Sequence, residues 1–108
     1  MNAVGVLTPE QLRSWRDEGK PFALLDVRTP AECEIAALLP AIQIPMNEIP
    51  SRLDEIPTAD PVVVMCHYGE RSAHVAAFLA ASNVSHVYNL EGGIDAYAGR
   101  IDPSIRRY

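Results

Sequence analysis

Short apolar runs alternate with polar, charged stretches along the whole chain. The runs are rich in valine, leucine and isoleucine, and each is bounded on at least one side by a proline, a cysteine or a glycine pair. Apolar runs of this length between turn-forming residues are typical of buried β-strands. We therefore predict strands over residues 22–27 (FALLDV), 41–45 (AIQIP), 62–65 (VVVM) and 86–90 (HVYNL).

Two Thr-Pro pairs mark helix starts, in Thr8-Pro9-Glu10-Gln11 and in Thr29-Pro30-Ala31-Glu32. The threonine can cap the first turn, proline suits the first helical position, and the Gln or Glu at the end of each motif completes a capping box. We expect the first helix to end near Glu18, because Gly19 follows. We expect further helical segments over residues 47–56, 72–82 and 94–99.

The alternation of strands and helices predicts an α/β fold. Strands that are apolar on both faces are typical of parallel sheets covered by helices on each side. In such folds, ligands bind outside the carboxyl ends of the strands. Cys66 lies at this position, directly after the most hydrophobic run, and is therefore the first candidate for chemistry.

Length and composition are those of one folded domain over residues 1–108. Of the 108 residues, 48% are hydrophobic and 21% are charged, which is ordinary for a globular chain. The net charge of −5 argues against a nucleic acid as partner, since phosphate binding needs a basic face. A local site for a small anion is still compatible with this charge.

The sequence contains no evident targeting segment. The first residues lack the basic and apolar regions of a signal peptide, and no stretch reaches the ~20 apolar residues of a membrane helix. Without a secretion signal, the two cysteines, Cys33 and Cys66, are expected to be reduced thiols. We therefore expect a cytoplasmic protein without a membrane partner, with one thiol available for chemistry.

The loop Cys66–Ser72 (CHYGERS) combines features of a nucleophile in an anion-binding site. A tight turn between a strand and a helix directs backbone N–H groups and the helix N-terminus toward one point. Gly69 permits the turn, Arg71 adds a fixed positive charge and Ser72 can cap the helix. Such surroundings favour the thiolate of Cys66, which is the nucleophilic form. The alternative is a buried structural cysteine, and the glycine, arginine and serine that follow favour chemistry.

This loop and three further segments resemble the rhodanese family of sulfurtransferases. The similarity extends over residues 8–98 and leaves residues 99–108 as a tail. A C-x-x-G-x-R-S loop after a hydrophobic strand, followed later by an L-x-G-G turn, is a specific combination, whereas each segment alone is a weak signal. The segments are LLDVRTPAECE (24–34), LPAIQIP (39–45), VVVMCHYGERS (62–72) and VYNLEGGIDAY (87–97).

The resemblance implies a rhodanese-like three-layer α/β/α domain with a central, mainly parallel five-stranded sheet. It implies that Cys66 takes a sulfane sulfur from a small anionic donor, such as thiosulfate or a low-molecular-weight persulfide, and holds it as a persulfide. Cyanide or a thiol then accepts the sulfur, and another protein can serve as donor or acceptor. No metal or organic cofactor is needed. The loop residues implied to bind the donor are His67, Tyr68, Gly69, Glu70, Arg71 and Ser72.

Some positions depart from the family pattern. Residues 36–41 (AALLPA) stand where members usually show Gly-His-Ile-Pro-Gly-Ala. Cys33 occupies the place of an aromatic residue, and Tyr97 occupies that of a tryptophan. Glu70 adds a negative charge to the loop, which argues against a simple dianionic donor such as thiosulfate.

Several polar residues allow a structural interpretation beside the functional one. Asp26 and Arg28, at the end of a neighbouring strand, either support the loop or form a structural ion pair. His67 and Tyr68 either line the mouth of the site or are exposed loop side chains. Arg71 either contacts an anion or forms a surface ion pair, and its place in the loop favours the anion.

Residues outside the loop have weaker functional signals. Cys33 could resolve a persulfide on Cys66 or form a disulfide with it, but a small packed side chain is the favoured interpretation. His74 and His86 have no evident partners, and the adjacent Cys-His pair of the loop lacks a second ligand pair at zinc spacing, so no metal site is expected. Residues 106–108 (RRY) are expected to form a solvated tail.

Two other functions are open. Cysteine phosphatases use a related loop, but their signature has five residues between cysteine and arginine, whereas four residues separate Cys66 and Arg71 here. The shorter loop suits a sulfur-sized group better than a phosphate. Rhodanese-like domains that have lost the cysteine act as binding or regulatory modules, whereas this chain retains it.

Overall fold

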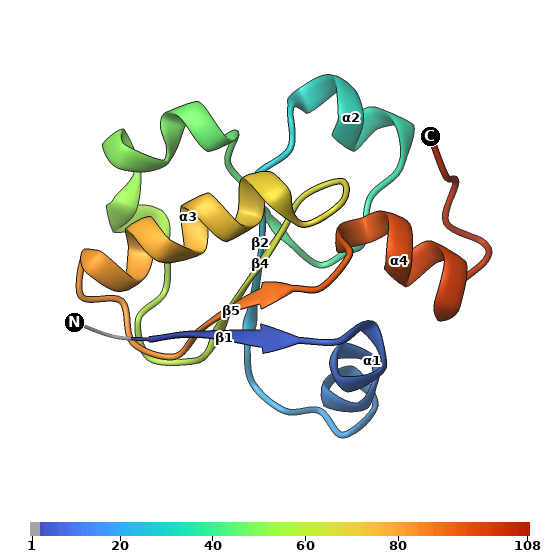
Figure 1. Ribbon diagram of the computed structural model, residues 1–108, viewed down its shortest axis with the longest axis horizontal. Coiled ribbons are helices and arrows are strands. Elements are labelled where there is room, and N and C mark those ends of the chain that lie inside the picture. Colours follow the sequence, from blue (N-terminus) through green and yellow to red (C-terminus); the bar gives the residue numbers. More distant parts are fainter. Residues whose placement is uncertain (1–2) are drawn as a thin grey trace.

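Five strands form a single parallel sheet with the order β1-β5-β4-β2-β3 (Figure 1). The computed structural model describes residues 3–108. All four pairs of neighbouring strands are parallel, which confirms the predicted α/β class and the five-stranded sheet implied by the resemblance. The strands are β1 (Val4–Leu7), β2 (Ala23–Asp26), β3 (Ile42–Gln43), β4 (Val62–Met65) and β5 (Val87–Leu90).

Strand β1 is not among the strands that the hydrophobic pattern predicts. It lies at the edge of the sheet and pairs with β5, and its Val4 and Val6 side chains are exposed. Gly5 lies against the ring of Tyr88, where an added Cβ would come within 2.6 Å of a ring carbon. A short edge strand with a glycine and exposed valines carries a weak burial pattern, which explains the omission.

Capping boxes start the first two helices, as predicted. The N–H of Gln11 donates to Thr8 Oγ1 at 3.1 Å, and the N–H of Glu32 donates to Thr29 Oγ1 at 3.3 Å. The Gln11 and Glu32 side chains accept the N–H groups of the two threonines in return. The helices are α1 (Pro9–Asp17), α2 (Pro30–Ile35), α3 (Glu70–Ala81) and α4 (Gly93–Arg100).

The helical turns predicted over residues 47–56 are two 3-10 helices, η1 (Met46–Ser51) and η2 (Leu53–Glu55). Backbone N–H groups in this segment reach carbonyls three residues back. Pro50, inside η1, has no N–H with which to extend an α-helical ladder. The composition therefore limits the segment to short, tight turns.

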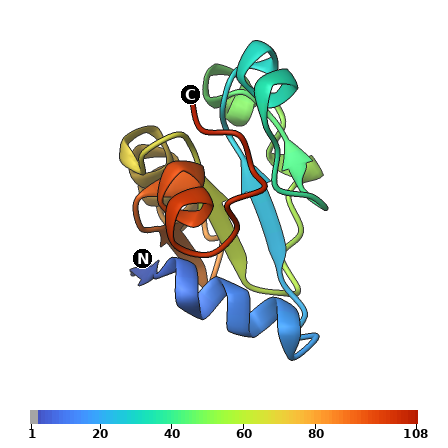
Figure 2. The ribbon, with the colours of Figure 1, turned by 90° about the vertical axis from the view of Figure 1, so that its right-hand side faces the viewer.

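Helices cover both faces of the sheet and bury two hydrophobic cores. α1 and α4 lie on one face, toward the viewer in Figure 2, and α3 lies with η1 on the other. Every residue of β4 is buried, and its side chains alternate between the two cores. The α3 core includes Leu25, Val62, Val64, Cys66, Val75 and Leu79, and the α1/α4 core includes Leu7, Leu12, Leu24, Val63, Met65, Leu90 and Ile94, with Trp15 packed against it.

The carboxyl edge of the sheet brings polar side chains together. Asp26 at the end of β2 is in register with Met65 of β4, which directly precedes Cys66. Asn89 of β5 is in register with Val64 of β4. Because parallel strands end at the same edge, all three polar side chains lie at one end of the fold, where α/β proteins bind ligands.

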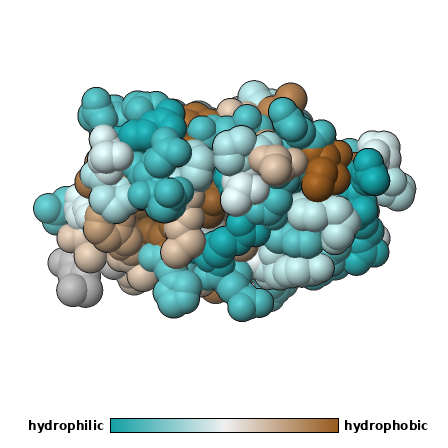
Figure 3. Space-filling model, turned by 90° about the horizontal axis from the view of Figure 1, so that it is seen from above, coloured by the Kyte–Doolittle hydropathy of each residue, from teal (hydrophilic) through white to brown (hydrophobic). Residues whose placement is uncertain are grey.

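The surface seen from above is mostly hydrophilic, with small separate hydrophobic areas (Figure 3). The partly exposed large apolar side chains Ile35, Met46 and Phe78 come from different elements. Met46 and Phe78 line one small pocket between η1 and α3, and limited apolar exposure of this kind is ordinary for a folded domain. Over residues 3–108, no helix combines the length and the apolar character that crossing a bilayer requires.

Candidate active site

Cys66 follows β4 directly and is only 1% exposed. The carbonyls of Cys66 and His67 accept the N–H groups of Ile94 and Asp95 at 2.9 and 3.1 Å. A Cβ on Gly93 would lie 2.5 Å from both of these carbonyl oxygens, so this close approach requires glycine. The N–H groups in the first turn of α4 therefore bind the carbonyls at the start of the loop and hold it in place.

Two groups that can donate a hydrogen bond approach the sulfur of Cys66, and one of them, the Ser72 hydroxyl, has its single proton directed at Asn89 Oδ1. The N–H of Gly69 lies 3.1 Å from Sγ, and the hydroxyl of Ser72 lies 3.3 Å from it. Gly69 has a φ of +105°, a conformation that glycine adopts at little cost. Hydrogen bonds from such donors stabilise negative charge on sulfur, as in a thiolate or a persulfide anion.

Ser72 does not cap α3, and the predicted start of this helix is wrong. The helix begins at Glu70, with Gly69 as its N-cap, so Ser72 lies within the first turn. The Ser72 hydroxyl is buried, lies near Cys66 Sγ and donates to Asn89 Oδ1 at 2.6 Å. The left-handed conformation of Gly69 turns the chain into the helix earlier than a serine cap would.

Asn89 is a site residue that the sequence analysis misses. Its Nδ2 donates to the carbonyl of Gly69 at 3.1 Å, which turns its Oδ1 toward the Ser72 hydroxyl. Asn89 therefore orients both residues that contact the sulfur. The sequence does contain a signal for Asn89, namely an amide side chain within the apolar strand VYNL. A polar group in a buried strand needs hydrogen-bond partners.

Arg71 forms a bidentate ion pair with Glu32 of α2. Its Nη1 lies 2.6 Å from Oε1 and its Nη2 lies 2.9 Å from Oε2. The Arg71 guanidinium holds the pKa of Glu32 well below its usual range, and Glu32 raises the pKa of Arg71. Both groups are therefore charged at neutral pH. The structure thus shows the ion-pair alternative for Arg71, and its contact with an anion stays a prediction.

Three aromatic rings stack beside the loop. The His67 ring lies between those of Tyr68 and Tyr108, with both centroid distances at 3.8 Å. Tyr68 is 55% exposed, so the stack begins at the surface. The Tyr108 hydroxyl donates to Glu32 Oε2 at 2.7 Å and accepts from Arg28 Nη1 at 3.0 Å. Burial raises the pKa of Tyr108 to about 12, so this phenol stays neutral and keeps its proton.

The prediction of a solvated tail over residues 106–108 is wrong. Ile105 packs against the α1/α4 core, and Arg107 Nη2 lies 3.0 Å from Asp95 Oδ2. Tyr108 then reaches the loop through its stack on His67. Arginines in a short tail suggest solvation, but the isoleucine and the tyrosine beside them supply contacts that hold the segment on the domain.

Asp26 and Arg28 form a buried ion pair behind the loop. Arg28 Nη2 lies 2.7 Å from Asp26 Oδ2, and both residues are at most 1% exposed. The guanidinium also donates to the carbonyls of Glu32 and Ala36 and to the Tyr108 hydroxyl. The structure thus shows the ion pair, which contacts Glu32 and Tyr108 beside the loop. Its support of the loop stays a prediction.

Comparison with known proteins gives these residues a family context. Residues 8–100 match the model of the rhodanese-like domain. The chain belongs to this family. The matched range confirms the resemblance that the sequence motifs indicate over residues 8–98.

Relatives of this rhodanese-like domain carry the name sulfurtransferase. The domain is 38% identical over 95 residues to a sulfurtransferase from Allochromatium vinosum, across 88% of this chain and 89% of that one. It is 36% identical over 104 residues to the probable adenylyltransferase/sulfurtransferase MoeZ from Mycobacterium tuberculosis, across 94% of this chain and 26% of MoeZ, so it spans about a quarter of that relative. A rhodanese-like domain protein from Staphylococcus aureus has a similar crystal structure, with a TM-score of 0.84 and 30% identity over 97% of this chain and 99% of that one. These relationships support sulfurtransferase activity.

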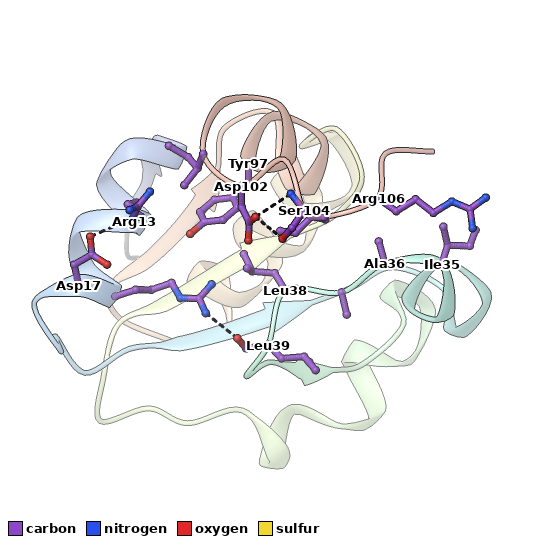
Figure 4. Close-up of a pocket in the computed structure, with 14 residues that line it drawn as sticks. Arg13, Asp17, Ile35, Ala36, Leu38, Leu39, Tyr97, Asp102, Ser104 and Arg106 are labelled. Carbon is purple, nitrogen blue, oxygen red and sulfur yellow. Dashed lines mark hydrogen bonds and ion pairs between the residues drawn. The ribbon is translucent and has the colours of Figure 1, made fainter.

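A cavity of about 790 Å³ in the rhodanese-like domain lies away from the Cys66 loop (Figure 4). It is bounded by α1, residues 35–39 and residues 101–106, and none of the loop residues lines it. Within it, Arg16 donates to the carbonyl of Leu39 at 2.8 Å. We assign no substrate to this cavity.

Other side chains with metal-binding chemistry are dispersed in the rhodanese-like domain. His74 lies in α3, and His86 precedes β5 with a positive φ of 58°. Among residues 3–108, no three His, Cys, Asp or Glu side chains are grouped so that they could hold a metal ion.

Cys33 is a free thiol beside the buried Asp26–Arg28 pair. Its Sγ lies 3.6 Å from Asp26 Oδ2. Burial, together with the Asp26 carboxylate, raises the pKa of the Cys33 thiol to about 11. Cys33 is therefore an unreactive thiol at neutral pH, in agreement with the packing interpretation.

The pH dependence of Cys33 labelling follows from this raised pKa. In a Cys66→Ser variant we expect iodoacetamide to label Cys33 slowly at pH 8, because about one thiol in a thousand is ionised three units below its pKa. The rate should rise about tenfold per pH unit up to about pH 10, since the thiolate is the reacting form. Intact-protein mass spectrometry over a pH series measures the labelling rate of Cys33. A rate that levels off below pH 9 contradicts the expectation.

Proposed function

We propose that this rhodanese-like domain is a sulfurtransferase in which Cys66 carries the transferred sulfur as a persulfide. The observation that carries the proposal is the placement of Cys66 Sγ at the end of β4, with the Gly69 N–H directed at it and the Ser72 hydroxyl oxygen 3.3 Å away. These donors suit a sulfur atom that gains negative charge during the reaction. Family membership supplies the reaction class.

In the first step, the Cys66 thiolate attacks the outer sulfur of a donor such as thiosulfate. The new S–S bond forms as the bond inside thiosulfate breaks, and sulfite leaves with the bonding electron pair. The thiolate becomes a persulfide anion and the total charge is conserved. The Gly69 N–H stabilises the anion, and the Ser72 hydroxyl adds to this by turning its single proton from Asn89 Oδ1 to the charged sulfur.

In the second step, an acceptor attacks the outer sulfur of the persulfide. Cyanide forms a C–S bond and leaves as thiocyanate, and the electron pair of the broken S–S bond restores the Cys66 thiolate. A thiol acceptor reacts in the same way as its thiolate. The two half-reactions predict ping-pong kinetics. They require no metal and no organic cofactor.

The remaining loop residues are proposed to surround the bound donor. His67 and Tyr68 lie in the aromatic stack at the surface, and Glu70 and Arg71 open helix α3. Tyr68 is the exposed end of this stack and is the proposed contact for an acceptor or donor protein. We propose the cytoplasm as the location, since a reducing compartment keeps both thiols free.

Intact-protein mass spectrometry tests sulfur loading directly. We expect wild-type protein incubated with thiosulfate, mercaptopyruvate or a low-molecular-weight persulfide to gain the mass of one sulfur atom with at least one donor. Added cyanide should remove this mass and yield thiocyanate. The Cys33→Ser variant is the matched control and should load like wild type. Absence of loading with every donor, or loading that maps to Cys33, would overturn the proposal.

A further inference from the structure

We propose that Glu32 sets the charge of the site and makes it select sulfur donors with at most one negative charge, such as thiol persulfides, over the thiosulfate dianion. This inference rests on the proposed sulfurtransferase function, since it concerns the donor that reaches Cys66. Its basis is the position of Glu32, which belongs to α2 and yet contacts the loop through Arg71.

The loop carries a single side chain with a fixed positive charge. Arg71 is the only arginine or lysine within residues 66–72. Both of its terminal nitrogens are bound to Glu32, at 2.6 and 2.9 Å. Glu70 is exposed in the same turn of α3. Together Glu32, Glu70 and Arg71 carry a formal charge of −1, so the site lacks the excess positive charge that a dianion requires.

Glu32 is firmly held by its hydrogen-bond partners. Its Oε1 accepts the N–H and the hydroxyl of Thr29, both at 3.2 Å. Its Oε2 accepts the Tyr108 hydroxyl at 2.7 Å, and Arg28 donates to that same hydroxyl. The bonds from Arg71 favour the ionised carboxylate, so Glu32 does not release Arg71 by protonation at neutral pH. A donor therefore meets a neutralised arginine.

An extra unit charge about 6 Å from a donor changes the rate about tenfold if the effective dielectric constant is about 40, which lies between the values for a protein surface and for bulk water. Thiosulfate carries two negative charges. Methanethiosulfonate has the same outer sulfur but carries one negative charge, because a methyl group replaces an oxygen. A comparison of thiosulfate with methanethiosulfonate therefore measures charge selection with little change in donor chemistry.

The test uses Glu32→Gln, which removes the charge and keeps a similar shape, with Glu34→Gln as the control. Glu34 is an exposed residue of the same helix. We expect Glu32→Gln to raise the ratio of thiosulfate loading to methanethiosulfonate loading about tenfold over wild type, and Glu34→Gln to leave the ratio within about twofold. In both reactions the Cys66 thiolate takes the outer sulfur, and sulfite or methanesulfinate leaves with the electron pair.

A second measurement is independent of sulfur transfer. Iodoacetate and iodoacetamide both alkylate the Cys66 thiolate, with an S–C bond forming as iodide leaves with the electron pair of the C–I bond, but only iodoacetate is an anion. In a Cys33→Ser background, we expect Glu32→Gln to raise the iodoacetate-to-iodoacetamide rate ratio about tenfold. Tyr108→Phe keeps the charge of Glu32 and should change the ratio less than about twofold.

The outcomes separate the two proposals. Unchanged ratios in Glu32→Gln overturn the charge-selection proposal, whatever the loading yield. A shifted alkylation ratio without sulfur loading by any donor supports charge selection and overturns the proposed function. Glu32→Met serves as a second neutral variant, so the result is taken from whichever variant melts at the wild-type temperature.

Discussion

Cys66→Ser is expected to lower thiocyanate formation by at least about a thousandfold, because a serine oxygen cannot accept and release the sulfane sulfur. Serine is nearly isosteric with cysteine, and both donors at the sulfur, Gly69 N–H and Ser72 hydroxyl, can also bond to an oxygen. The variant should therefore retain the fold while it loses the reaction. The measurement is the steady-state rate with a donor that loads wild type, with cyanide as acceptor.

Cys33→Ser supplies the control for this experiment. Its thiol lies beside Asp26 and is held in the protonated form by burial, so we expect its loss to change the rate less than about twofold. A Cys66→Ser rate above about a tenth of wild type would show that the sulfur travels by another route. Equal losses in both variants would instead indicate a dithiol mechanism.

Arg28→Met is expected to lower the free energy of unfolding by about 3–5 kcal/mol, because it leaves the buried Asp26 carboxylate without its partner. The pair is inaccessible to solvent on both sides, and Arg28 also bonds the carbonyls of Glu32 and Ala36. Methionine has a similar apolar length, so the loss reports on charge and hydrogen bonds more than on volume. Urea unfolding gives the free energy difference.

Two comparisons make the Arg28 result specific. Arg13→Met removes an exposed pair with Asp17 and should cost less than about 1 kcal/mol. The double variant Asp26→Leu/Arg28→Met removes both buried charges and should be more stable than Arg28→Met alone. If the double variant is less stable than the single one, the unpaired carboxylate is not the source of the loss.

Much of the fold follows from local sequence. The capping boxes at Thr8 and Thr29 start helices where the sequence predicts them, because one short motif satisfies the free N–H groups of the first turn. Strand β4 is equally clear, because burial on both faces requires an uninterrupted apolar run. Strand β1 is less clear, since an edge strand depends on its pairing with β5, and pairing between distant segments leaves no local pattern.

The candidate site likewise has one part that local sequence predicts and one part that depends on distant segments. Cys66 and the turn at Gly69 follow from adjacent residues. The partners of the loop come from elsewhere in the chain: Asn89 from β5, Glu32 from α2 and Tyr108 from beyond α4. Their roles depend on the tertiary fold, so a single sequence offers at most a signal where a polar residue stands out, as Asn89 does within an apolar strand.

The separation of the two cores has a practical consequence for optical assays. Trp15, the only tryptophan, packs against Phe22 and Tyr88 with ring centroids 5.8 and 5.3 Å away, on the α1/α4 side of the sheet, whereas Cys66 belongs to the α3 core. Indole emission should therefore follow denaturation and stay nearly constant when sulfur is added to Cys66. The absorbance of the persulfide and the fluorescence of the indole thus provide independent readouts of occupancy and of integrity in one cuvette.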